Sequence, residues 1–171
     1  MARWSGEIAI GRESLRVGLK TACRFVLAAI RLARPRGTRV LGCPAMTDGD
    51  YNELVGVEVL DVGPEGARAR IEVGPQHLQP FGTVHGGVYA SLAETICSVA
   101  TYTAVHEDGM VAMAQSNATT FVRPVTEGTV TAVATPRQRG RTTWVWDCDL
   151  TDDDDRICAL ARLTIAVRPG R

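Results

Sequence analysis

The sequence has few histidines, few aromatic residues and no spacing typical of a metal site. Three histidines occur in 171 residues, aromatic residues make up 5% of the chain, and no CxxC pair is present. Zinc sites in proteins need several Cys or His ligands at short, characteristic spacings. No apolar stretch reaches the roughly 18 residues that span a bilayer. We therefore expect no metal, no cofactor and no transmembrane helix.

The chain also lacks a net charge, because 19 Lys or Arg balance 19 Asp or Glu. A neutral chain has no general attraction for polyanions, so we expect no nucleic-acid partner. The two signs are unevenly distributed. Residues 1–45 contain nine Lys or Arg against two Glu, whereas the remaining residues contain 10 Arg against 17 acids. A basic N-terminal segment therefore precedes an acidic body.

The basic segment, residues 1–45, differs from the rest of the chain. Basic residues recur at every fourth position from Arg12 to Arg24, with apolar residues between them. This pattern fits a basic amphipathic helix on a membrane surface or an Arg-rich transit peptide. We favour a simpler interpretation, in which the segment is a disordered extension or lies upstream of the true start at Met46. We then expect no membrane contact, and one compact domain over residues 46–171.

Cysteines are odd in number, and three of them lie in apolar runs. An odd count without CxxC favours free, buried thiols in a reducing cytoplasm over a disulfide framework. We therefore expect a cytoplasmic protein. The five cysteines are Cys23, Cys43, Cys97, Cys148 and Cys158.

Alternation of apolar and polar residues predicts six strands and one long helix. The helix is predicted roughly over residues 84–105, and it is apolar on most sides, so the sheet should wrap around it. The order of two strands, one helix and four strands predicts an α+β fold with an antiparallel sheet. Trp144 and Trp146 are expected in the sheet, one or both at a subunit contact, and His77 and His106 in loops. The strands are predicted at residues 55–59, 67–73, 111–122, 129–137, 144–150 and 157–167.

The predicted helix carries one carboxylate, Glu94, in an otherwise uncharged stretch from Val73 to His106. A carboxylate in apolar surroundings is costly unless it is paired or has a chemical role. An ordinary solvated Glu is the alternative. Gly86 and Gly87 open the helix, where unpaired N–H groups could receive a carbonyl oxygen that gains negative charge. The alternative for the glycines is tight packing between helix and sheet.

The two ends of this candidate site are too far apart to act together within one chain. Glu94 follows Gly86 by eight residues, which is a rise of ~12 Å along a helix. A Glu side chain leans toward the helix N-terminus but recovers only part of that distance. If both groups are catalytic, a second subunit must supply one of them. The spacing therefore predicts a dimer with its site at the interface.

The stretch HLQPFGTVHGGVYASLAETICSVA resembles the central motif of hot-dog-fold acyl-CoA thioesterases. The similar branch contains the phenylacetate-degradation thioesterases and the hydroxybenzoyl-CoA thioesterase with a catalytic glutamate. The resemblance extends over about residues 51–167. It implies an antiparallel sheet wrapped around one central helix, and hydrolysis of an acyl-CoA thioester to a free acid and CoA. The substrate could equally be a thioester of an acyl carrier protein.

The resemblance also implies a role for each residue of the motif. Glu94 would be the nucleophile or general base. The Gly86 N–H and the Gln79 side chain would polarise the thioester carbonyl. Ser98 would hold the attacking water or orient Glu94, and His85 would brace the loop and the start of the helix.

Arginines offer candidate contacts for the phosphates of CoA, because the guanidinium group matches phosphate geometry. Arg137, Arg139 and Arg141 cluster at a turn between two predicted strands, and Arg123 ends another strand. A solvated basic hairpin is the alternative. Relatives form dimers that often pair into tetramers, which implies the same for this chain. Some relatives also carry a histidine in the strand after the helix, and the stretch 117–121 has none.

Two other functions stay open at this stage. A non-catalytic acyl-CoA-binding protein would keep the arginines but would not need Glu94. A hot-dog enoyl-CoA hydratase or dehydratase would need a His and acid pair, and the usual motifs for that pair are absent. The sequence does not identify the acyl group.

Overall fold

The computed structural model describes residues 50–170. The basic segment, Cys23 and Cys43 lie outside these residues. Within them, no helix is both long and apolar enough to cross a bilayer. The helices are α2 (Tyr51–Val55) and α3 (Gly86–Val105), with 3₁₀ turns at Pro75–His77 and His106–Asp108; the strands are β1 (Glu58–Gly63), β2 (Gly66–Glu72), β3 (Met110–Phe121), β4 (Thr129–Arg139), β5 (Thr143–Thr151) and β6 (Ile157–Pro169).

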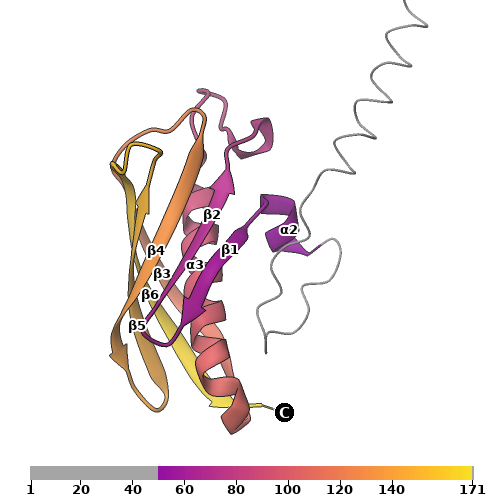
Figure 1. Ribbon diagram of the computed structural model, residues 1–171, viewed down its shortest axis with the longest axis vertical. Coiled ribbons are helices and arrows are strands. Elements are labelled where there is room, and N and C mark those ends of the chain that lie inside the picture. Colours follow the sequence, from indigo (N-terminus) through magenta and orange to yellow (C-terminus); the bar gives the residue numbers. More distant parts are fainter. Residues whose placement is uncertain (1–49, 171) are drawn as a thin grey trace, which may run out of the picture. The chain divides into compact units, whose positions relative to one another are not determined.

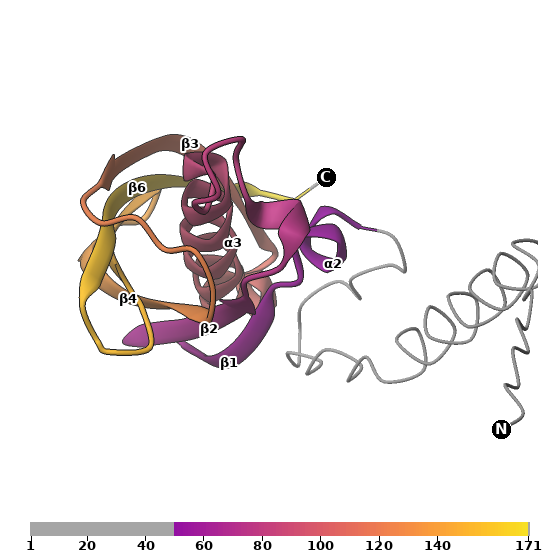
Figure 2. The ribbon, with the colours of Figure 1, turned by 90° about the horizontal axis from the view of Figure 1, so that it is seen from above.

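The strands form one antiparallel sheet in the order β1-β2-β4-β5-β6-β3. The sheet curves around α3, which runs along its inner face (Figures 1 and 2). This arrangement confirms the predicted α+β hot-dog fold. The side of α3 between the β1 and β3 edges is not covered by the sheet. There α2 contacts α3, because the Tyr51 hydroxyl hydrogen-bonds Ser91 Oγ (2.7 Å) and Asn52 Oδ1 accepts from Thr95 Oγ1 (2.7 Å).

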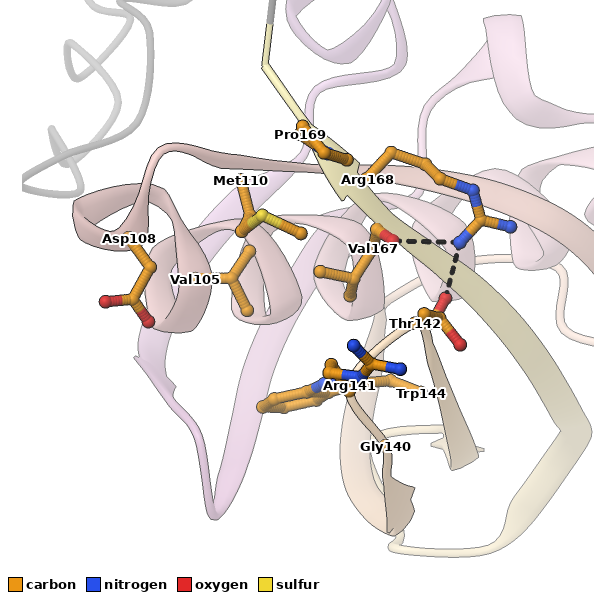
Figure 3. Close-up of a pocket in the computed structure, with 10 residues that line it drawn as sticks. All are labelled: Val105, Asp108, Met110, Gly140, Arg141, Thr142, Trp144, Val167, Arg168 and Pro169. Carbon is orange, nitrogen blue, oxygen red and sulfur yellow. Dashed lines mark hydrogen bonds between the residues drawn. The ribbon is translucent and has the colours of Figure 1, made fainter.

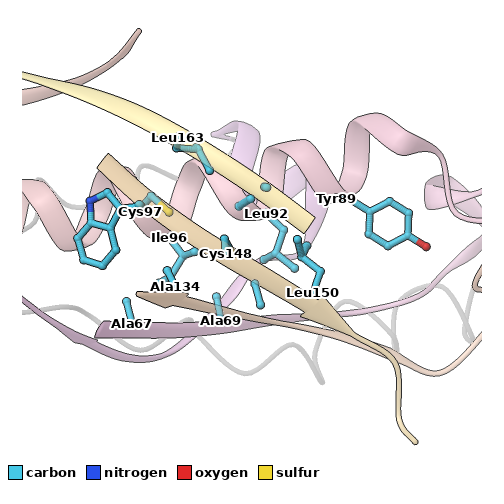
Figure 4. Close-up of a cluster of buried hydrophobic side chains, with 14 of the residues drawn as sticks. Ala67, Ala69, Tyr89, Leu92, Ile96, Cys97, Ala134, Cys148, Leu150 and Leu163 are labelled. Carbon is cyan, nitrogen blue, oxygen red and sulfur yellow. The ribbon is translucent and has the colours of Figure 1, made fainter. Parts of the chain in front are cut away.

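The core lies between the inner face of the sheet and α3 (Figure 4). Leu92 and Ile96 of α3 are fully buried, as is Trp146 of β5. The Trp146 indole N–H donates to Thr101 Oγ1 (2.9 Å), and that hydroxyl donates to the Cys97 carbonyl (2.8 Å). The prediction that both tryptophans lie in the sheet is confirmed. A subunit contact through Trp146 is wrong, because its indole is needed inside the chain to satisfy a buried hydroxyl.

Three thiols are free and buried, as predicted for Cys97, Cys148 and Cys158. Removal from water disfavours a thiolate. Burial raises the pKa of Cys158 to about 11. This thiol is therefore protonated at neutral pH and is a packing residue rather than a nucleophile.

The first predicted strand begins later than expected, because residues 51–55 form a helix. Asp50 caps this helix by accepting from the Glu53 N–H (2.9 Å). Gly56 ends it with a left-handed backbone (φ 72°), which glycine adopts without strain. The alternating valines at 55, 57 and 59 indicated a strand, but a single turn of helix preserves the burial of all three. The Asp50 cap therefore favours the helix over a strand in residues 51–55.

His77 lies in a 3₁₀ turn and is 3% exposed, although it was expected in an open loop. Its Nδ1 accepts from the Gly74 N–H (2.9 Å), and its Nε2 lies 2.9 Å from the Val55 carbonyl. A carbonyl can only accept, so Nε2 carries the proton. Both ring nitrogens are satisfied, which makes His77 a structural link between α2 and the loop that precedes α3.

Strand β3 is an edge of the sheet and pairs only with β6 among the described strands. Its twelve residues, MVAMAQSNATTF, contain no charged side chain. Proteins usually protect exposed edges with charges, proline or very short strands. This edge has none of these protections, so it is suited to pairing with another strand.

Candidate active site

The loop that leads into α3 is held in a compact shape by its own hydrogen bonds. The Gln79 N–H donates to the Thr83 carbonyl (2.8 Å), and the Gly82 N–H donates to the Gln79 carbonyl (2.9 Å). The Gln79 side-chain amide donates to Thr83 Oγ1 (2.7 Å). These bonds fix the direction of the Gln79 side chain and leave one of its two amide hydrogens available.

The first N–H groups of α3 are not all equivalent. His85 is the N-cap residue, and its Nδ1 accepts from the Gly87 N–H (2.9 Å). The His85 carbonyl accepts from the Val88 N–H (2.9 Å). Within the part of the chain that the structure describes, no acceptor takes the Gly86 N–H. Gly86 is therefore the donor left for a ligand at the positive end of the helix.

A cavity of about 520 Å³ lies at this end of α3. Three of the predicted site residues, Gln79, His85 and Gly86, line it, and so do Phe121 at the end of β3 and Arg123 just beyond it. The Phe121 ring lies so close to Gly86 that a Cβ built there would be 2.6 Å from Cζ. Because glycine has no side chain, the Phe121 ring can pack directly against the first residue of α3.

Tyr89 lies one turn further along α3 and lines the same cavity. Its ring centroid is 6.0 Å from that of Phe121. The Tyr89 hydroxyl is buried. Burial raises the pKa of Tyr89 to about 12, so the hydroxyl is neutral at physiological pH.

Glu94 lies two turns into α3, on the side that the sheet leaves open, and it is exposed in the single chain. Asn117 Nδ2 donates to its Oε2 (3.3 Å). The expectation of a carboxylate in apolar surroundings is therefore wrong for one chain taken alone. Most other residues of the helix are buried or half-buried, which fits its lack of further charges, and Glu94 is exposed.

The structure does not bring Glu94 to the Gly86 cavity within one chain. Both residues belong to the same unbroken helix, eight residues apart, which is ~12 Å of rise. Ser98 lies one turn beyond Glu94 and is half-buried. Its hydroxyl makes no hydrogen bond with Glu94 in residues 50–170. The sequence-predicted residues thus form two groups, one at each end of a helical segment.

The four arginines lie in different surroundings. Arg137 Nε is 3.3 Å from Asp147 Oδ2. Arg139 pairs with Glu65 and lies over the Trp144 ring, 5.9 Å from its centroid. These two guanidinium groups are therefore already engaged.

Arg141 and Arg123 have no carboxylate partner in the described residues, and each lines a cavity. Arg123 lines the Gly86 cavity. Arg141 lines a cleft of about 720 Å³ at the opposite end of α3, beside Trp144 and Met110 (Figure 3). Arg168 borders the same cleft and donates to the Thr142 carbonyl (2.7 Å).

Sequence reasoning missed Phe121, Asn117 and Thr119 as neighbours of the site. All three belong to β3, and Asn117 and Thr119 are linked by a hydrogen bond (2.7 Å). The available signal was a pair of polar residues two positions apart in a strand, on the face directed at an apolar core. Such side chains need partners; here α3 provides them for Asn117, and Asn117 provides one for Thr119.

The chain is similar in sequence to known hydrolases. A family model described as "Thioesterase superfamily" matches residues 81–159. The 1,4-dihydroxy-2-naphthoyl-CoA hydrolase of Listeria monocytogenes is 34% identical over 119 residues, which are 70% of this chain and 96% of that protein.

Two solved structures of thioesterases share the fold. Thioesterase HI1161 of Haemophilus influenzae is 35% identical, with a TM-score of 0.66 over 71% of this chain and 84% of that one. A variant of thioesterase PA1618 of Pseudomonas aeruginosa is 34% identical, with a TM-score of 0.68 over 71% of this chain and 88% of that one.

Proposed function

Because the chain belongs to the thioesterase superfamily and is a thioester hydrolase, we propose that it hydrolyses acyl-CoA thioesters to a free acid and CoA. The observation that carries the detailed proposal is the free Gly86 N–H at the positive end of α3, beside the Gln79 amide. Both groups suit a thioester carbonyl oxygen as it becomes negative.

In the proposed reaction, Glu94 supplies the carboxylate that acts on the carbonyl carbon. It either attacks that carbon directly, which gives an acyl–Glu94 anhydride that water then hydrolyses to the free acid, or takes a proton from the attacking water. The new C–O bond forms, the carbonyl oxygen gains negative charge against Gly86 and Gln79, and the C–S bond then breaks. A thiol has a pKa near 8.5, so CoA leaves as a thiolate without a strong general acid. Ser98, close to Glu94, is the candidate to hold the water.

The proposed active unit is a homodimer in which one subunit supplies Glu94 and the other supplies Gly86. The distance along α3 supports this arrangement, as does the exposure of Glu94 in a single chain. The unprotected β3 edge offers a place for two copies to pair. A two-fold axis perpendicular to α3 would run the two α3 helices in opposite directions, so each helix start would lie toward the partner's Glu94. Pairing of dimers into tetramers stays a prediction.

Arg141 and Arg123 are the better candidates for the phosphates of CoA among the four arginines. Arg137 and Arg139 already pair with Asp147 and Glu65, and a phosphate would have to compete with those carboxylates. A free guanidinium needs no such exchange. We therefore assign the first phosphate contact to Arg141 or Arg123, and a supporting role to the other two.

The test is thiol release from a panel of short, long and aromatic acyl-CoAs, followed with a free-thiol dye. Glu94→Gln keeps the size of the side chain but removes the carboxylate, and it should lower kcat by at least about 100-fold while leaving acyl-CoA binding intact. Glu107→Gln, at an exposed acid beyond the end of α3, is the matched control and should be fully active.

Three outcomes would contradict parts of this proposal. Turnover that survives in Glu94→Gln removes the catalytic role of Glu94. Tight binding without release across the whole panel favours an acyl-CoA-binding protein. Hydration of crotonyl-CoA favours a hydratase. A parallel assay with acyl carrier protein thioesters distinguishes the two carriers.

A further inference from the structure

We propose that Asn117 positions the Glu94 carboxylate for the reaction, and that Oε1 of Glu94 is the oxygen that acts on the substrate or water. Asn117 would be a positioning residue, since it would act through Glu94. The inference rests on the proposed function of Glu94 and adds a group that the sequence motif does not contain.

Two hydrogen bonds connect β3 to α3 at this point, and a third lies within β3. Asn117 Nδ2 donates to the Ala90 carbonyl (2.9 Å) and to Glu94 Oε2 (3.3 Å). Asn117 Oδ1 accepts from Thr119 Oγ1 (2.7 Å). Ala90 and Glu94 are neighbours on one face of the helix because they lie four residues apart. One amide group therefore bonds both the helix backbone and the carboxylate.

The direction of the Asn117 amide is set by the Ala90 carbonyl. A carbonyl oxygen can only accept a hydrogen bond, so the amino side of Asn117 must face it. If the amide turned over, Oδ1 would face both the Ala90 oxygen and the Glu94 carboxylate. Thr119 is compatible with the observed direction, because its hydroxyl can donate to Oδ1 on the other side. The donor aimed at Glu94 is thus fixed by contacts that do not involve Glu94.

This contact restricts a carboxylate that would otherwise be free to move. Glu94 is exposed in the single chain, and Asn117 is its one hydrogen-bond donor within residues 50–170. A Glu side chain has several rotamers, and selecting one before substrate binds removes an entropic cost from the reaction. Because the bond holds Oε2, Oε1 is the oxygen without a protein donor among residues 50–170.

A purely structural role for Asn117 is the alternative. In that case, the side chain would only tie β3 to the Ala90 carbonyl, and its loss would lower stability without a specific effect on the chemical step. The two roles make different predictions for kcat, for KM and for the pH dependence of kcat. All three can be measured in the full-length enzyme.

The experiment compares Asn117→Ala and Asn117→Asp with wild type, together with the control Thr120→Val. Thr120 is the exposed neighbour of Thr119, and no hydrogen bond from its side chain is found in the described chain. We expect Asn117→Ala to lower kcat by about 10-fold to 100-fold with KM changed less than about threefold, because a hydrogen bond to a charged group is lost. Thr120→Val should match wild type in both constants.

Asn117→Asp has nearly the same shape but places a second carboxylate against Glu94. Repulsion between like charges favours the protonated form of the pair. The acid limb of the kcat profile should therefore move to higher pH, which a structural role would not produce. If Asn117→Ala folds poorly, Thr119→Val removes only the supporting hydroxyl and should lower kcat a few-fold with KM unchanged.

The inference is overturned if Asn117→Ala and Asn117→Asp keep the kcat and the acid limb of wild type. It is also overturned if kcat falls only in step with the fraction of folded protein, as read from thermal unfolding. These outcomes differ from failure of the proposed function, in which Glu94→Gln itself retains turnover.

Discussion

Gly86 offers an unbonded backbone N–H at the start of α3, where the proposed chemistry needs a donor. His85 takes up the N–H groups of Gly87 and Val88, which leaves the Gly86 N–H unbonded at the edge of the cavity. This division of donors explains how two adjacent glycines can differ in role. It also permits a substitution that removes a single backbone donor.

Gly86→Pro should remove the proposed oxyanion donor while preserving the helix. Proline is well tolerated at the first position of a helix, and His85 already has the extended backbone (φ −66°, ψ 137°) that a residue before proline requires. We expect kcat to fall by about 100-fold to 1,000-fold, which is the usual effect of losing one oxyanion donor. Steady-state thiol release measures this change.

Gly86→Ala is the matched control, because it adds the same Cβ beside Phe121 but keeps the N–H. The Phe121 ring is 56% exposed and can move away from the added carbon. We expect the alanine variant to lose much less activity than the proline variant. Equal losses in the two variants would show that crowding by the side chain, and not the missing N–H, causes the effect.

Asp147 links three strands at the scale of secondary-structure elements. On β5, its carboxylate accepts from Arg162 of β6 at Nε (2.7 Å) and Nη2 (2.9 Å), with Arg137 of β4 nearby. The hydrogen bond with Arg162 holds the pKa of Asp147 below its ordinary value. The contribution to stability is small, because the arginine side chains are largely exposed.

A lowered pKa in the folded state fixes how this contribution depends on pH. It should be fully present above the unfolded-state pKa of about 3.9 and be lost as pH falls through the lower pKa of the folded state. In urea unfolding, Asp147→Asn should be less stable than wild type at pH 7, and the difference should shrink as the pH is lowered below the unfolded-state pKa. Asp149→Asn, an exposed acid of the same strand, is the control. A difference that does not change with pH would contradict the expectation.

The elements with strong periodicity could be predicted from sequence, and those set by single contacts could not. Alternation located β2, β4, β5 and β6, and the long apolar run located α3, because burial on the inner face of the sheet dictates both patterns. Helix α2 depends on the Asp50 cap, and the burial of His77 depends on the Val55 carbonyl. Such contacts depend on individual residues, and an alternation of apolar and polar residues along the sequence does not indicate them.

The candidate site could likewise be predicted only in part. Residue type and spacing made Gly86 and Glu94 candidates, and the resemblance to a known family added Gln79. The contact between Asn117 and Glu94 spans 23 residues and depends on how β3 lies against α3, which only the folded chain defines. The separation of the arginines into engaged and free groups likewise depends on neighbouring strands.

At the scale of the whole molecule, we propose that one chain holds two half-sites. The donors at the start of α3 and the carboxylate two turns further along cannot reach one carbonyl carbon, and the open face of α3 beside the uncharged β3 edge is where a second copy would complete both. The proposed dimer rests on distance, exposure and an unprotected strand edge taken together. Its activity should depend on residues contributed by both subunits.

The most direct test combines two inactive variants in one dimer. Glu94→Gln and Gly86→Pro chains, co-expressed with different affinity tags, are purified as the heterodimer, and thiol release is measured. One of its two sites then carries both substitutions and the other carries neither, so the account predicts roughly half of the wild-type activity from two inactive parents. A heterodimer as inactive as its parents would contradict a site shared between subunits.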